Sequence, residues 1–222
     1  MTFPCLEIPH LIDDYFNRHV ILPYDLSIGE VRAGMLEVYE VLHDINRILF
    51  DRSASRLEDT ILGNSLSGII SELLVKSIAD KSPSLIRNEK VGGHPDLLPI
   101  GYYDSSEILH GSDGIEIKSS IQKGGWQGHN PEDAWIMVFR YQVDTVTLPI
   151  ENRAPTRFIQ VLLAELQQED WSFSGRRGTS RRTPTASITK TGMHKLRSNP
   201  IYQEPEAVVN PRNYSFDALY GE

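Results

Sequence analysis

Apolar residues recur at helical spacing near the start of the chain. Residues 28–50 carry an apolar side chain every three or four positions, which is the pattern of a long amphipathic helix. The preceding Ser27-Ile28-Gly29-Glu30 has the Ser-x-x-Glu form of a capping box, so we expect the helix to begin there. A second helical stretch is predicted over residues 57–80, with a break near Gly63 and Asn64.

From residue 91 onward the pattern becomes that of β-strands. A short strand is predicted to begin after Pro95, a second over residues 113–121 and a third over residues 134–144. The third is an almost continuous apolar run, which favours a strand covered on both faces. Residues 156–166 fit either a helix or a central strand. We favour the strand, because the sheet otherwise has only three clear members.

This order of elements predicts an α/β (α+β) fold with a central sheet. The length suits one domain over residues 1–222. It divides into an N-terminal helical part (residues 1–64), a core (residues 65–170), and a final segment (residues 171–222) that reads as a basic loop followed by an extended tail.

The second predicted strand contains Gly-Ile-Glu-Ile-Lys-Ser-Ser, residues 114–120. Side chains alternate between the two faces of a strand, so Glu116 and Lys118 share one face while Ile115 and Ile117 share the other. The isoleucines are expected to face the core. The charged pair fits either a solvated ion pair or a hydrolytic site, in which the carboxylate binds a metal and the lysine assists an attacking water.

The overall composition is that of a soluble globular protein, with 40% hydrophobic and 23% charged residues. The chain has no apolar run of about 18 residues and no secretory signal pattern, so we expect no membrane span and a cytoplasmic location. Cys5 is the only cysteine. This excludes a disulfide within the chain and disfavours a cysteine-based zinc site.

Positive charge is concentrated in one segment of an acidic chain. The net charge is −8, yet the stretch from Trp171 to Pro200 contains no acid and carries +7, which leaves −15 on the rest. Its cations are Arg176, Arg177, Arg181, Arg182, Lys190, Lys195 and Arg197. Such a segment is either a solvated basic loop or a surface that binds phosphates.

Together these residues resemble a known group. Pro95-Asp96 followed by Glu116-Ile117-Lys118, with a helical glutamate such as Glu72 upstream, is similar to the pattern of the PD-(D/E)XK nuclease superfamily and of its type II restriction endonucleases. The resemblance covers roughly residues 65–145. It implies a restriction-endonuclease-like mixed central β-sheet flanked by helices, and Mg²⁺-dependent hydrolysis of phosphodiester bonds in double-stranded DNA.

The resemblance also implies roles for individual residues. Asp96 and Glu116 match the metal-binding acids, Lys118 matches the catalytic lysine, and the carbonyl of Ile117 would complete the metal site. Glu72 matches less securely. Five other acids compete for a place in the site, namely Glu58, Asp59, Asp104, Glu107 and Asp113. The donor set suits Mg²⁺, which prefers carboxylate, carbonyl and water oxygens.

Two stretches are candidates for contact with DNA. The Gly-rich stretch after the second strand contains Lys123, Trp126, Gln127 and Asn130. Gln and Asn can read adenine, and Trp126 would either stack on DNA or cap the core. The other candidate is the basic segment defined above. Because cutting both strands needs two sites, an enzyme of this kind is expected to act as a homodimer.

The sequence therefore leads to a Mg²⁺-dependent, sequence-specific DNA endonuclease of the restriction type. Two alternatives keep the nucleic-acid partner: a DNA-repair nuclease, and a DNA-binding or assembly subunit on the same fold without independent cleavage. A third alternative is an α/β protein unrelated to nucleic acid, in which Glu116 and Lys118 form a structural ion pair.

Overall fold

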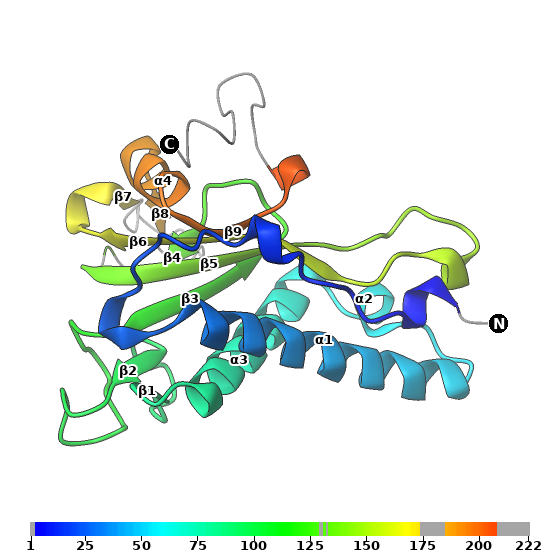
Figure 1. The fold of residues 1–222 in the computed structure, drawn as a ribbon, viewed down its shortest axis with the longest axis horizontal. Helices are drawn as coiled ribbons and strands as arrows, with labels where there is room; N and C mark the ends of the chain where they lie inside the picture. Colours follow the sequence, from blue (N-terminus) through cyan, green and yellow to red (C-terminus); the bar gives the residue numbers. More distant parts are fainter. Residues whose placement is uncertain (1–2, 129–130, 132, 174–184, 208–222) are drawn as a thin grey trace, which may run out of the picture.

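A six-stranded mixed sheet forms the centre of the structure (Figure 1). The structure is a computed structural model that describes residues 3–128, 131, 133–173 and 185–207. The strands of the sheet, in spatial order, are β1 (Leu85–Arg87), β2 (Leu97–Pro99), β3 (Ile115–Ser120), β5 (Ala134–Gln142), β6 (Arg157–Leu166) and β9 (Pro200–Gln203). β3 and β5 run parallel, and the other neighbouring pairs are antiparallel. The expected mixed central sheet is confirmed, and residues 157–166 are a strand.

Helices cover one face of this sheet. α1 (Ile28–Asp51) and α3 (Gly63–Lys81) lie together below β3, β5 and β6 in Figure 1, and the short α2 (Leu57–Thr60) precedes α3. Ser27 and Glu30 form the predicted capping box at the start of α1. The expected break falls at residues 61–62, just before Gly63. No helix in the described ranges combines the length and apolar character that crossing a membrane requires.

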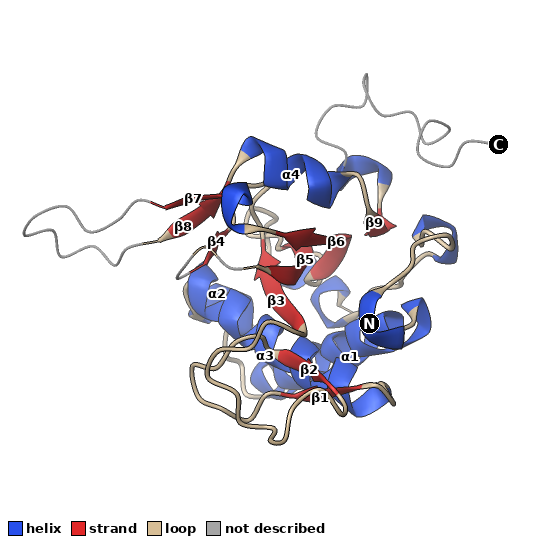
Figure 2. Cartoon of the chain, turned by 90° about the vertical axis from the view of Figure 1, so that its left-hand side faces the viewer, coloured by secondary structure: helices blue, strands red, loops and turns tan. Residues whose placement is uncertain are grey.

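The opposite face is covered by α4 (Lys190–Arg197) and a small second sheet. This sheet contains β4 (Gln127–Gly128), β8 (Ala186–Ile188) and β7 (Trp171–Phe173), in that spatial order. Figure 2 shows α4 and the small sheet above β3, and α1 and α3 below it. Short 3-10 turns complete the chain: Pro4–Leu6, Asp13–Tyr15, Pro23–Asp25, Ile150–Asn152, Gln168–Asp170 and Pro205–Ala207.

Strand alternation assigns each face of β3 to one of two apolar clusters. Ile115 and Ile117 pack into the cluster formed with α1 and α3. Glu116 and Lys118 are the register partners of Ile136 and Val138, which belong to the cluster under α4 and the small sheet. Neighbours in register point to the same face of a sheet. The charged pair therefore lies on the face opposite to the long helices, as the alternation predicted.

The prediction for the C-terminal segment was wrong in its described parts. Residues 171–200 are not a simple loop, because they contain β7, β8 and α4. Residues 200–203 are not a tail lying on the body, because β9 pairs with β6 as an edge of the main sheet. The three-residue β1 was not predicted. Elements this short carry no periodicity, and only their long-range pairing defines them.

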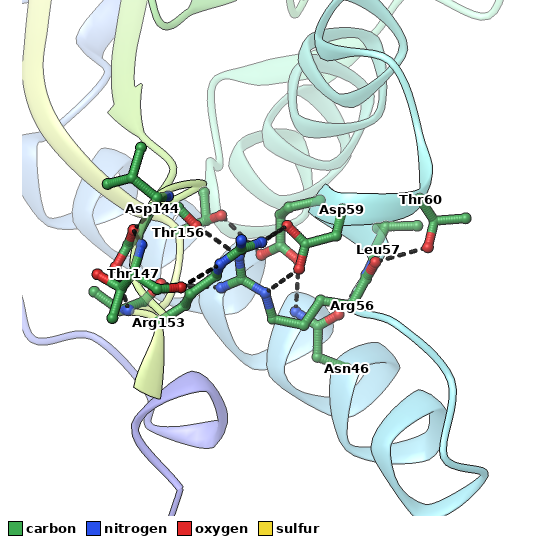
Figure 3. Close-up of polar contacts among 12 residues, drawn as sticks. Asn46, Arg56, Leu57, Asp59, Thr60, Asp144, Thr147, Arg153 and Thr156 are labelled. Carbon is green, nitrogen blue, oxygen red and sulfur yellow. Dashed lines mark hydrogen bonds and ion pairs between the residues drawn. The ribbon is translucent and has the colours of Figure 1, made fainter. Parts of the chain in front are cut away.

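A polar network at the end of β5 joins the helices to the loop before β6 (Figure 3). The buried Arg56 side chain pairs with Asp59 at 2.9 Å and donates to the carbonyls of Asp144 and Ala154. Arg153 pairs with the other oxygen of Asp59. Because a buried guanidinium needs acceptors on all sides, this arrangement binds the loop firmly to α2.

Candidate active site

Asp96 reaches β3 because β2 is too short to pair along its whole edge. The described pairing between the two strands consists of Leu97 opposite Ile115. Beyond that point the outward N–H groups of β3 are satisfied by side chains. Ile117 N donates to Asp96 Oδ2 at 2.8 Å, and Ser119 N donates to Ser71 Oγ of α3 at 3.1 Å. Asp96 therefore replaces a strand partner immediately beside Glu116.

The Glu116 carboxylate lies between two side chains that bear nitrogen atoms, those of His94 and Lys118. Lys118 Nζ donates to Glu116 Oε1 at 3.1 Å, and His94 Nδ1 lies 2.9 Å from Glu116 Oε2. The three side chains are only 14–17% exposed. Partial burial strengthens these charge-assisted bonds relative to those of a surface ion pair. Glu116 and Lys118 thus form an ion pair that is mostly buried, and His94 extends it.

The segment before β2 is held rigidly. The buried Asn88 side chain donates to the carbonyls of Pro95 and Ile108, at 2.9 and 2.8 Å, and its backbone N donates to the Asp96 carbonyl at 2.8 Å. Gly114 lets β3 approach this segment. A Cβ at Gly114 would lie 2.2 Å from the Leu97 carbonyl oxygen, and its φ of +136° strongly favours glycine. The position of Asp96 is therefore determined by packing at both ends.

The two carboxylates titrate very differently. Burial and the negative charge of Glu116 raise the pKa of Asp96 to about 7. Burial would also raise the pKa of Glu116, but the hydrogen bond from His94 and the positive charge of Lys118 hold it at about 2. Adjacent carboxylates in a low-dielectric site behave in this way, because the second ionisation must work against the first.

This donor set fits the metal that the resemblance implies. Within the described ranges no group of three or more His, Cys, Asp or Glu side chains is arranged as a metal site. Mg²⁺, however, commonly takes one or two carboxylates and keeps several waters. Asp96 and Glu116 supply those carboxylates, and a divalent cation would relieve the repulsion that raises the Asp96 pKa. The Ile117 carbonyl points to the same strand edge as its N–H, where Asp96 lies.

The structure does not bring Glu72 to this cluster. Its side chain is exposed on α3 and pairs with Arg87 Nη2 at 2.8 Å, on the helix-covered face of the sheet. The described contacts therefore join the Glu72 carboxylate to Arg87 and not to Glu116 or Lys118, so they do not support the place in the site that the sequence suggested for this acid.

The competing acids also lie elsewhere. Glu58 is buried and accepts hydrogen bonds from Asn46 and Thr156, while Asp59 pairs with Arg56 in the network of Figure 3. Asp104 and Glu107 are exposed on the loop between β2 and β3, and Asp113 accepts from Ser112. These contacts leave Asp96 and Glu116 as the described acids that meet at β3.

Trp126 is not available for stacking on a ligand. The side chain is 4% exposed and packs with Trp171, Ile188 and Met193 beneath the small sheet. Of the two interpretations of this tryptophan, the structure supports the one in which it caps the core. Gln127, the next residue, is exposed on β4.

The structure places the described cations of the predicted DNA surface around α4 and the small sheet. Lys123 and Lys190 are exposed. Arg197 donates to the Lys123 carbonyl at 3.0 Å, and Lys195 pairs with Asp170 at 2.5 Å. These elements cover the same face of the main sheet that carries Lys118. The remaining predicted contacts lie outside the described residues: Asn130, Arg176, Arg177, Arg181 and Arg182.

Sequence reasoning missed His94, Asn88 and Gly114. His94 stands directly before Pro95-Asp96, and Gly114 directly before the predicted strand, so adjacency to the motif was the available signal. No local pattern marks Asn88, because its importance comes from contacts across a loop of twenty residues.

Comparison with models of known protein families found no match, and comparison with curated proteins found no relative. The family is therefore not established by similarity over the chain.

Proposed function

We propose that this protein is a Mg²⁺-dependent endonuclease that hydrolyses phosphodiester bonds in double-stranded DNA, with sequence specificity of the restriction type. The observation that carries the proposal is the hydrogen bond from Ile117 N to Asp96 Oδ2. It joins two short motifs that are 20 residues apart in sequence at a single strand edge. A surface ion pair between Glu116 and Lys118 would not require Asp96 there.

The chemistry assigned to each residue follows from its type and position. Asp96, Glu116 and the Ile117 carbonyl would hold the metal, which when bound polarises the phosphate and lowers the pKa of a coordinated water. Lys118 carries a compact positive charge beside this site. Its role is to orient the attacking water and to stabilise the negative charge that develops on phosphorus.

The DNA surface is proposed to include α4 and the small sheet. β4 lies within the predicted Gly-rich stretch, and the four arginines lie in the sequence that joins β7 to β8. Since β8 pairs with both β4 and β7, one sheet contains a strand of the Gly-rich stretch and the two described strands that flank the arginines in sequence. The net positive charge of residues 171–200 complements a phosphate backbone.

Cleavage of DNA by the purified protein tests the proposal. Plasmid DNA of varied sequence is incubated with Mg²⁺ or with EDTA, and the ends are mapped. We expect cleavage at defined sites with Mg²⁺ alone. Linear products that form without accumulation of nicked circles would indicate two centres acting together, as in the proposed homodimer.

A variant of Lys118 tests whether the cluster of Asp96, Glu116 and Lys118 is the site that cleaves DNA. Lys118→Ala should reduce the cleavage rate by about 100- to 1000-fold while DNA binding remains, because the charge is needed at the transition state. Lys76→Ala removes an equally charged side chain from the exposed surface of α3, and should cleave normally. Equal cleavage by the Lys118 variant would exclude this mechanism. Binding without cleavage by the wild type would favour the DNA-binding subunit.

A further inference from the structure

The residue that precedes the Pro-Asp motif contacts the next motif directly. His94 Nδ1 lies 2.9 Å from Glu116 Oε2, across 22 residues of sequence. An ionised carboxylate can only accept hydrogen bonds, so Nδ1 must carry the proton and act as the donor. Nothing in the motif itself assigns His94 a role.

The backbone fixes the position of His94 independently of Glu116. Its N donates to the Leu109 carbonyl at 3.2 Å, and its carbonyl accepts from Gly111 N at 2.8 Å. Asn88 holds the following Pro95 carbonyl. The imidazole therefore extends from an anchored segment, and its hydrogen bond restricts Glu116 to one orientation.

His94 and Asp96 together hold two successive residues of β3. Asp96 accepts from the backbone of Ile117, and His94 donates to the side chain of Glu116. The same three-residue segment thus places one proposed metal ligand and orients another. A partner that fixes a ligating carboxylate typically changes metal affinity by 10- to 100-fold when removed.

We propose that His94 is a positioning residue that orients the Glu116 carboxylate for a divalent metal ion. This inference rests on the proposed function, since it presupposes that Glu116 is a ligand. Lys118 holds the other oxygen of the same carboxylate, so two nitrogen donors, one on each oxygen, define its orientation. In the simpler interpretation, the contact between His94 and Glu116 only stabilises the fold.

Binding of Mn²⁺, followed by electron paramagnetic resonance in the absence of DNA, tests this role without relying on activity. His94→Ala should weaken binding by about 10- to 100-fold. His94→Asn should recover part of the loss, because its amide nitrogen lies near the position of Nδ1. His94→Gln places its amide near the position of Nε2 and should behave like the alanine variant. His110→Ala, an exposed histidine on the neighbouring loop, is the matched control and should bind as the wild type does.

Cleavage measured against Mg²⁺ concentration provides the second measurement. The alanine variant should need correspondingly more Mg²⁺ for half-maximal rate, with a smaller change at saturating metal. If folded His94→Ala or His94→Gln binds Mn²⁺ as tightly as the wild type, the positioning role is wrong while the endonuclease proposal stands. If the wild type binds no divalent metal, the proposed function itself fails, and this inference fails with it.

Discussion

Individual side chains at the candidate site combine functional chemistry with a cost in stability. Asp96 is held beside the ionised Glu116 in a partly buried position, which raises its pKa. The hydrogen bond that Asp96 accepts from Ile117 N lowers the pKa again, but by less than burial and Glu116 raise it. Groups with perturbed pKa values cluster at functional sites for this reason. The site is therefore expected to become more stable when its charge repulsion is removed, even though its chemistry is lost.

The Asp96→Asn variant measures this cost. In the wild type the unfolded carboxyl loses its proton near pH 4, whereas the folded one keeps it until about pH 7. The folded state binds more protons in this interval, so its free energy of unfolding should fall as pH rises from about 4 to about 7. Asp96→Asn should flatten this fall and still accept from Ile117 N.

Urea denaturation between pH 5 and pH 8 in EDTA checks the prediction. The contribution of Glu116 lies below this range, because its pKa is lowered to about 2. Asp104→Asn alters an exposed carboxyl of the connecting loop and should keep the wild-type slope. An Asp96 variant with an unchanged slope would mean that Asp96 is ionised normally in the folded protein.

At the scale of elements, the approach of β3 to β2 decides whether the two motifs meet. Gly114→Ala would place a methyl group 2.2 Å from the Leu97 carbonyl at a φ of +136°. We expect a loss of roughly 1–3 kcal/mol in the free energy of unfolding. Because β3 must move, cleavage and Mn²⁺ affinity should fall with it. Gly68→Ala in α3, where an added Cβ has open space, is the matched control. Wild-type metal binding by Gly114→Ala would show that the close approach is unnecessary.

The small sheet gives a separate prediction about DNA affinity. Arg181→Ala combined with Arg182→Ala should weaken duplex binding and flatten its dependence on log salt by up to roughly two units, since each phosphate contact contributes about 0.9. Both arginines lie outside the described residues, within the sequence joining β7 and β8. Fluorescence anisotropy over a salt series measures the slope. An unchanged affinity and slope would indicate that these arginines are only solvated, and Gln127 and Lys123 would then be the next candidates.

Across the whole molecule, stability and catalysis should be separable. Arg56→Ala removes the centre of the buried network in Figure 3 and leaves Asp59 and two carbonyls with lost partners. We expect the free energy of unfolding to fall by about 3 kcal/mol. Cleavage by the folded protein should be retained, because the described contacts of Arg56 include no residue of the candidate site. Arg47→Ala, an exposed arginine of α1, should change stability little. A selective loss of cleavage in folded Arg56→Ala would instead connect this network to the site.

The sequence by itself determined the features that depend on local periodicity. The Ser27–Glu30 capping box and the apolar spacing of residues 28–50 defined α1, because helix capping and amphipathicity involve neighbours within one or two turns. Strand alternation put Glu116 and Lys118 on one face of β3, since the side-chain period of a strand is two. The distribution of charge along the chain likewise follows directly from the order of the residues.

Only the tertiary structure decided which segments lie next to β3. β2 begins only at Leu97, opposite Ile115, so Asp96 and Ser71 satisfy the next N–H groups along the edge of β3. His94 reaches Glu116 from a segment that is held by Asn88. Glu72, on α3, pairs with Arg87 and makes no described contact with Glu116 or Lys118. Each of these outcomes depends on contacts between residues far apart in the chain. Periodicity specifies which way a side chain points, whereas long-range packing specifies what it meets.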